Sequence, residues 1–326
     1  MNKQNCYALL MVASLFAVSA NAAPMAYSVN SDSTTGDNLY LIDLATGVDQ
    51  LRGNLFTGIE DRTDTEGLAF SPNPGSQLWG MDDASGTLFP IDPSNGSINW
   101  ENEIQLPVEF QSGGGNDFGM TFACDNSLYF TSVKSKTLYL RDPNGSFRSV
   151  GTAGSLGVSI SAIAAIGNPT RLYGLGNGQF SNGTTDSPNL YSIDPTTGTA
   201  SLIGPLGQVG EYKYNEAGMS FDSDGGLWAI TDRSQIDNQK SQILRINVLT
   251  GAATLQATTL NQVGYESLAI SPPGSCVTDE EEEEAIDEGL SDDGLPRIPT
   301  LTMAGRLTAI LVLMLAGMLI LRRRYS

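Results

Sequence analysis

The sequence predicts an all-β protein: a five-bladed β-propeller closed by pairing of its N- and C-terminal strands, followed by a C-terminal transmembrane or sorting helix. A turn motif recurs five times in steps of about 50 residues, a spacing typical of propeller blades. Apolar, strand-like segments recur with the turn motif, and the two ends of the repeat region complement each other. These observations together predict one closed ring of small sheets.

Each copy of the turn motif has Asp or Asn at its third position and ends with Gly. An Asp side chain can accept hydrogen bonds from backbone amides two residues further on, and Gly tolerates the positive φ that returns the chain into the next strand. Alternating apolar residues lead into these turns, as expected of half-buried strands. Each copy is therefore predicted to form a hairpin within one blade. The copies are 41–47, 90–96, 140–145, 192–198 and 245–251.

Two further segments recur between the turns. One is rich in small and apolar residues, which suit the crowded strands beside the axis; its copies are 66–70, 118–122, 162–166, 217–221 and 266–270. The other contains aromatic residues, which we expect to pack between neighbouring sheets rather than to bind a ligand. Its copies are 78–80, 128–130, 172–174 and 227–229.

The ends of the repeat region explain each other. Residues 26–29 match a second strand, so the first blade has no inner strand of its own, whereas 266–271 is an inner strand with no blade behind it. We expect the C-terminal strand to complete the first blade, which leaves no open sheet edge. The propeller is thus predicted over residues 25–275.

The N-terminal residues 1–22 have the pattern of a secretory signal peptide, with Lys3, an apolar stretch and small residues before the cleavage site. Export would place the propeller in an oxidising compartment. Cys124 and Cys276 each follow an inner strand and should lie on the same face near the axis, so a disulfide between them is expected. Two free thiols are the alternative.

Beyond the propeller, residues 276–297 form an acidic linker that is expected to be disordered, because the run of acidic side chains at 279–284 repels itself. Residues 298–326 then contain an apolar stretch long enough to span a membrane, and a basic cluster that should stay in the cytoplasm. The cluster consists of Arg322, Arg323 and Arg324.

Ile298, Pro299, Thr300 and Leu301, the apolar stretch and the final arginines resemble the IPTL-CTERM class of bacterial sorting signals. That resemblance implies processing by a membrane protease or transpeptidase of the exosortase type. It also implies an exported protein, either anchored in the inner membrane with the propeller outside the cytoplasm or released to the cell surface. An anchor that is never cut is the alternative. The turn repeats are similar to the Leu-Tyr-x-Ile-Asp-x-x-Thr-Gly repeats of secreted bacterial propellers.

Composition excludes several chemistries. The chain has no histidine, so Ser-His-Asp triads, Cys-His pairs and histidine metal sites are excluded. Its formal net charge of −19 argues against nucleic acid and anionic membrane surfaces as partners.

Four acidic residues are expected at one mouth of the ring, with Ser161 at the corresponding place before 162–166. Converging carboxylates repel each other unless a cation, an arginine or water lies among them, and Ca²⁺ prefers clustered carboxylates. A central metal site is therefore one hypothesis, and acids that cap strand ends or face solvent are the alternative. The four residues are Glu66, Asp117, Glu216 and Glu266.

Two functions from different classes remain open. Tyr212, Tyr214 and Tyr265 lie beside the predicted inner strands and favour a binding rim, and hence a non-catalytic module that binds a protein, glycan or small ligand at the envelope. The segment 65–68, Thr-Glu-Gly-Leu, is similar to one in secreted five-bladed glutaminyl cyclotransferases, which implies Glu66 as an acid–base group. A metal-dependent hydrolase using the mouth carboxylates belongs to the same alternative.

Overall fold

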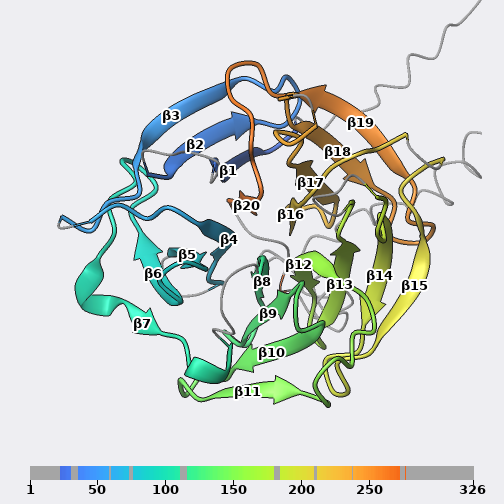
Figure 1. Ribbon diagram of the computed structural model, residues 1–326, viewed down its shortest axis with the longest axis horizontal. Helices are drawn as coiled ribbons and strands as arrows, with labels where there is room; N and C mark the ends of the chain where they lie inside the picture. The colour runs from blue at the N-terminus through green and yellow to red at the C-terminus, as the bar shows by residue number, and fades with distance from the viewer. Residues whose placement is uncertain are drawn as a thin grey trace, which may run out of the picture. The chain divides into compact units, whose positions relative to one another are not determined.

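The computed structural model describes residues 23–30, 36–58, 60–72, 76–110, 116–179, 184–208, 211–236, 238–271 and 276. Within them, five four-stranded antiparallel sheets surround a common axis, as Figure 1 shows. In each sheet, one edge strand lies nearest the centre of the ring and the opposite edge strand lies at the periphery. The prediction of an all-β five-bladed propeller is confirmed.

Each sheet is one blade, described here from its inner to its outer strand. The first blade contains β20 (Ala269–Ile270), β1 (Met25–Asn30), β2 (Asn38–Asp43) and β3 (Asp49–Asn54). The second contains β4 (Thr65–Phe70), β5 (Leu78–Asp82), β6 (Thr87–Ile91) and β7 (Ile104–Gln105). The third contains β8 (Phe118–Phe122), β9 (Leu128–Ser132), β10 (Thr137–Arg141) and β11 (Phe147–Val150).

The remaining two blades follow the same plan. The fourth contains β12 (Ile160–Ile166), β13 (Arg171–Gly176), β14 (Asn189–Ile193) and β15 (Ala200–Pro205). The fifth contains β16 (Ala217–Phe221), β17 (Leu227–Thr231), β18 (Gln242–Ile246) and β19 (Ala253–Thr258). Two short 3₁₀ helices, η1 (Trp100–Asn102) and η2 (Val108–Phe110), flank β7.

The recurring turns form as their sequence predicts. In the first, Asp43 Oδ1 accepts the amide of Ala45 at 2.8 Å, and the amide of Gly47 donates to Asp43 O at 2.8 Å. Gly47 has a φ of 73°, and a Cβ there would lie 2.0 Å from Thr258 O of the neighbouring blade. Glycine is therefore needed both for the turn and for blade-to-blade packing.

The ring closes through the two ends of the repeat region. β20 pairs antiparallel with β1, with Ala26 opposite Ile270 and Tyr27 opposite Ala269. The hydroxyl of Ser28 donates to Ser267 O, and the Val29 amide donates to Ser267 Oγ at 3.2 Å. The predicted completion of the first blade by the C-terminal strand is confirmed.

Aromatic side chains pack both within blades and between neighbouring blades. Phe130 stacks on Tyr139 at 5.1 Å between ring centroids, and Trp79 approaches Phe122 at 6.4 Å. Trp228 is 5 % exposed, and the guanidinium of Arg245 lies 4.7 Å from its ring centroid. These aromatic residues of the second strands therefore contribute to packing, as their recurrence in the sequence predicts.

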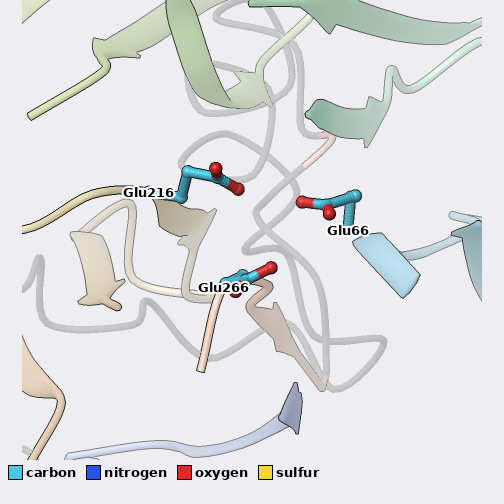
Figure 2. A group of neighbouring side chains, drawn as sticks. All are labelled: Glu66, Glu216 and Glu266. Carbon is cyan, nitrogen blue, oxygen red and sulfur yellow. The ribbon is translucent and has the colours of Figure 1, made fainter. Parts of the chain in front are cut away.

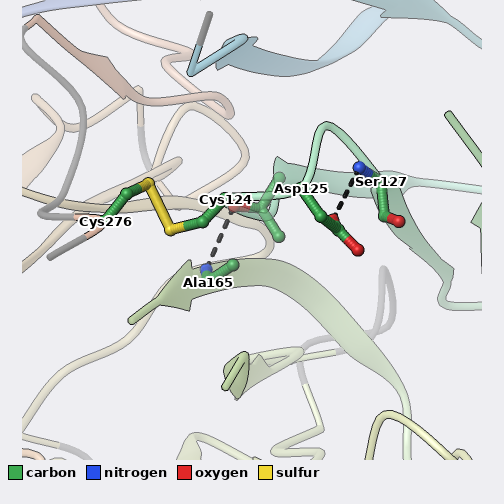
Figure 3. The surroundings of a disulfide bond; sticks show 6 residues. Cys124, Asp125, Ser127, Ala165 and Cys276 are labelled. Carbon is green, nitrogen blue, oxygen red and sulfur yellow. Dashed lines mark hydrogen bonds between the residues drawn. A yellow bond between two sulfur atoms is a disulfide. The ribbon is translucent and has the colours of Figure 1, made fainter. Parts of the chain in front are cut away.

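Cys124 and Cys276 form a disulfide, with their Cα atoms 5.4 Å apart (Figure 3). Cys124 lies in the turn after β8, and Cys276 lies beyond β20. Both cysteines line a small cavity where the inner strands end, together with Phe122, Phe221 and Ile270, the last residues of three of those strands. The disulfide thus fixes the closing segment to the third blade.

The predicted signal peptide at 1–22, the acidic linker after Cys276 and the sorting signal at 298–326 lie outside the described residues. They stay predictions. Within the part of the chain that the structure describes, no helix has the length and apolar character needed to cross a membrane.

Candidate functional site

Three glutamates from different blades converge where the inner strands begin. Each offers a carboxylate oxygen, and these oxygens all lie within 4.8 Å of one another. Figure 2 shows Glu66, Glu216 and Glu266 pointing toward a common point. Glu66 and Glu266 are each 8 % exposed, and Glu216 is half-buried.

A β-bulge in the second blade places Glu66 at this point. Thr65 pairs with Asp82, and the next paired residue is Gly67, opposite Met81, so Glu66 is an extra residue. Bulges re-aim a side chain locally. The closing segment has a similar irregularity. Tyr265 bridges to Asn30 and Ala269 pairs with Tyr27, so four steps along the closing segment lie opposite three along β1. The extra residue lies between Tyr265 and Ala269, the stretch that contains Glu266.

In two other blades the strands pair regularly at the mouth. Their acidic residue lies directly before the first paired residue of the inner strand, one position earlier than Glu66 does in the second blade. In β16, Ala217 pairs with Thr231, and Glu216 precedes it, with its carbonyl accepting the Asp232 amide at 2.8 Å. In β8, Phe118 is the first paired residue and Asp117 precedes it. Asp117 has a φ of 43°, a left-handed conformation that costs energy for a residue with a side chain.

Small residues let the inner strands approach closely behind these acids. A Cβ added at Gly218 would lie 2.2 Å from the carbonyl carbon of Ser267, and one added at Gly119 would lie 2.8 Å from Ser161 O. The backbone of each strand therefore contacts the next, which narrows the axis. The cavity beside the glutamates is only about 10 Å³ in volume.

Burial and mutual repulsion raise the pKa of the mouth carboxyls. The pKa of Glu66 lies well above its usual value because of burial first, and then because of the charges of Glu266, Glu216 and Asp117. Burial, followed by the charge of Asp117, raises the pKa of Glu216 to about 8. A side-chain hydrogen bond joins the carboxyls of Glu66 and Glu216, and such a bond requires a proton on one of the two.

Such a cluster has two ways of relieving repulsion: it binds protons, or it binds a cation. Opposite ligands of Ca²⁺ are about 4.6–5.2 Å apart, since each ligand lies about 2.3–2.6 Å from the ion. Carboxylate oxygens within 4.8 Å of one another match that spacing. The residues present therefore fit a hard divalent cation.

The structure brings together three of the four acids predicted at the mouth. Asp117 lies outside the group of three but close enough for its charge to raise the pKa of both Glu66 and Glu216. The pKa of Asp117 itself is raised to about 6, chiefly by burial.

The predicted tyrosine rim is placed differently. Tyr214 and Tyr265 are fully buried, and their hydroxyls donate to Gly176 O at 2.7 Å and to Asp49 Oδ2 at 2.9 Å. These two residues therefore belong to the core and offer no surface to a ligand. Tyr212 is half-buried, donates to Ala253 O at 3.3 Å and lines a cavity of about 220 Å³ with Pro188 and Leu206.

Asp37 was not predicted from the sequence. It is fully buried, its Oδ2 accepts the Thr65 amide at 2.7 Å, and it thereby holds the backbone beside Glu66. Burial raises the pKa of Asp37 to about 7. Its position directly before a strand resembles that of Asp117, and this was the one signal in the sequence that could have drawn attention to it.

Fold and site together define a class: a five-bladed propeller with a narrow acidic mouth. No family model and no curated protein matches the chain. Among solved structures, it is similar to a catalytically inactive virginiamycin B lyase of Staphylococcus aureus with quinupristin, at 16 % identity and a TM-score of 0.39 over 75 % of this chain and 73 % of that one. A gluconolactonase of Xanthomonas campestris is similar at 12 % identity and a TM-score of 0.43, over 74 % and 78 % of the two chains. Similarity at this level concerns the fold and assigns no chemistry to the mouth.

Proposed function

We propose that this protein is an exported, non-catalytic binding propeller whose mouth holds a divalent cation of the Ca²⁺ type on Glu66, Glu216 and Glu266. The observation that carries the proposal is the convergence of three carboxylates within 4.8 Å. Burial raises the pKa of Glu66 most, and the charges of the neighbouring acids raise it further, which reflects the negative potential that the mouth carboxylates create. A bound divalent cation removes that repulsion.

The shape of the mouth supports ion binding over turnover of a substrate inside the ring. A cavity of about 10 Å³ holds one water-sized particle, whereas small-molecule sites usually occupy about 300–1,000 Å³. The ligand of the propeller, a protein, glycan or small molecule, would therefore bind outside this cavity.

Export is supported by the signal-like residues 1–22 and by the Cys124–Cys276 disulfide, because disulfides persist in oxidising compartments. The tail at 298–326 supports attachment to the inner membrane and processing by an enzyme of the exosortase type. These parts of the proposal stand independently of the cation.

A second candidate function is a propeller enzyme that uses Glu66 as its acid–base group. The observation in its favour is the raised pKa of that buried carboxyl, a feature shared by many catalytic acids. Glutaminyl cyclisation of a peptide with N-terminal Gln, abolished by Glu66→Gln, would establish it.

The cation site is tested by titrating Ca²⁺ into the purified, chelator-treated protein. We expect saturable heat in calorimetry and a higher melting temperature, since an ion that binds the native state stabilises it. The Glu66→Gln/Glu216→Gln double variant should melt higher than wild type without Ca²⁺ and no longer respond to the ion. Glu109→Gln, an exposed acid on η2, is the matched control and should behave as wild type.

Absence of binding in wild type, or equal binding in wild type and the double variant, would overturn the proposal. The double variant also distinguishes ion binding from a purely structural role, because its melting temperature without Ca²⁺ should rise rather than fall. A residue that merely stabilises the fold would lower the melting temperature when substituted.

A further inference from the structure

We propose that Ser161 is the fourth protein group of the mouth site and holds a water ligand of the cation on the β12 side. This inference rests on the proposed cation site. It also predicts where water ligands of the ion exchange: on the side of the fourth blade, whose inner strand carries Ser161 at the position where the second blade carries Glu66.

Ser161 occupies the same structural position as Glu66. In the second blade, Glu66 is the extra residue between the pairs Thr65–Asp82 and Gly67–Met81. In the fourth blade, Ile160 pairs with Gly176 and Ala162 with Leu175, so Ser161 is the extra residue of an equivalent bulge. The two bulges lie at the same level of their inner strands, so the register places Ser161 at the same mouth as Glu66.

With Ser161 included, every blade contributes one oxygen-bearing side chain to the mouth. In the blades with a bulge it directly precedes Gly67, Ala162 or Ser267, and in the blades with regular pairing it lies two residues before Gly119 or Gly218. Ser161 is the neutral member of the ring. In blade order the five are Glu266, Glu66, Asp117, Ser161 and Glu216.

The hydroxyl of Ser161 has no partner within the described protein. The residue is 5 % exposed, and its Oγ is a buried atom without a hydrogen bond. Burying a hydroxyl without a partner is unfavourable, and such atoms in native proteins usually have an ordered water or an ion nearby. A water bound to the cation supplies the missing partner.

Coordination chemistry agrees with this role. Ca²⁺ takes about 6–8 oxygen ligands, and carboxylates, hydroxyls and waters all serve. Three glutamates leave positions for water, and a serine side chain is shorter than a glutamate side chain by two heavy atoms. Its hydroxyl therefore reaches the ion through a water, and an outside ligand with a carboxylate, phosphate or sugar oxygen could replace that water.

The test uses Tb³⁺, a luminescent substitute for Ca²⁺, whose decay rates in H₂O and D₂O count the waters on the ion. Ser161→Asp places a carboxylate where the water lies, so we expect one or more waters fewer and binding tighter on the order of tenfold, because affinity follows ligand charge. Ser161→Ala should weaken binding by roughly threefold through loss of one hydrogen bond. Thr131→Val, which removes another buried hydroxyl without a partner, should match wild type.

Wild-type water count and affinity in Ser161→Asp would overturn the inference. If Ser161→Asp does not fold, Ser161→Ala decides, and an affinity equal to that of Thr131→Val overturns the inference. Failure of wild type to bind Tb³⁺ or Ca²⁺ at all is a distinct result, since it removes the cation site itself.

Discussion

The hydroxyl of Tyr265 donates to Asp49 Oδ2 at 2.9 Å and so links the end of the last repeat to the outer strand of the first blade. Asp49 also accepts the Asn261 amide at 3.1 Å, the Asn261 side-chain amide, and the Gln262 amide at 2.9 Å. The carboxylate is 6 % exposed. The ring is thus closed twice: near the axis by β20 and β1, and further out by Asp49.

Tyr265→Phe should lower the free energy of unfolding by about 1.5–3 kcal/mol, the usual contribution of a hydrogen bond to a charged group. The phenyl ring keeps its packing against Tyr40, so the change isolates the hydroxyl. Urea unfolding measures the difference. Tyr212→Phe is the control: it removes a longer hydrogen bond to a backbone carbonyl and should lower the free energy of unfolding by less. If both variants lost the same free energy of unfolding, the hydrogen bond to Asp49 would stabilise the ring no more than a hydrogen bond to a backbone carbonyl does.

Reduction of the Cys124–Cys276 disulfide should destabilise the propeller by about 2–5 kcal/mol, because the bond closes a long loop in the unfolded chain. The two cysteines are 152 residues apart in sequence. Urea unfolding of oxidised and of reduced, alkylated protein gives the difference. The Cys124→Ser/Cys276→Ser variant should unfold like the reduced protein and ignore the reductant. An oxidised protein no more stable than this variant would contradict the prediction.

The turns could be predicted from sequence because they depend on local chemistry, as in the pair Asp43 and Gly47. The closure could be predicted because the first blade, which begins at 26–29, lacks one strand and the repeat region ends with one extra strand at 266–271. The convergence of Glu66, Glu216 and Glu266 was also predicted, from their common place before inner strands.

The geometry behind that convergence was not predictable in the same way. A bulge adds one residue without disturbing the apolar pattern, so periodicity does not reveal that Glu66 and Ser161 are extra residues whereas Asp117 and Glu216 are not. The inward orientation of Tyr265 depends on its distant partner Asp49, and the burial of Asp37 depends on Thr65. Neither contact leaves a local signal.

Asp37→Asn should flatten the dependence of stability on pH in chelator-treated protein. The folded-state pKa of Asp37 is about 7 and exceeds its ordinary value of 3.8, so its protonated form is favoured by folding. Its contribution is fully present below about pH 4 and is lost as the pH rises through 7. Asn keeps an acceptor for the Thr65 amide and does not titrate.

Urea unfolding between pH 4 and 8 checks this prediction. The wild type should lose stability across the range more steeply than Asp37→Asn. Asp92→Asn is the control: hydrogen bonds from Ser94 lower the pKa of this exposed acid, so it titrates below the range and its removal should leave the slope unchanged. Parallel curves for wild type and Asp37→Asn would refute the assignment.

Binding of Ca²⁺ should release protons at pH 7. In the metal-free mouth, the pKa of Glu216 is about 8, so its carboxyl holds a proton at pH 7 that a divalent cation must displace. The pKa of Glu66 is raised as well, which acts in the same direction. The heat of binding should then differ between PIPES and Tris, which take up protons with different enthalpies and bind Ca²⁺ only weakly. Affinity should fall as the pH is lowered, because protons compete with the ion.

Titration at pH 9, above the pKa of Glu216, provides an internal control, since fewer protons remain to be displaced. Two buffers of different ionisation enthalpy that work at pH 9, such as Tris and CHES, should then give more similar heats. Glu216→Gln should likewise release fewer protons than wild type at pH 7, because its amide carries no titratable proton. Identical heats in both buffers at pH 7, with binding intact, would mean that the carboxyls are already ionised. Repulsion among Glu66, Glu216 and Glu266 would then be relieved by something other than shared protons.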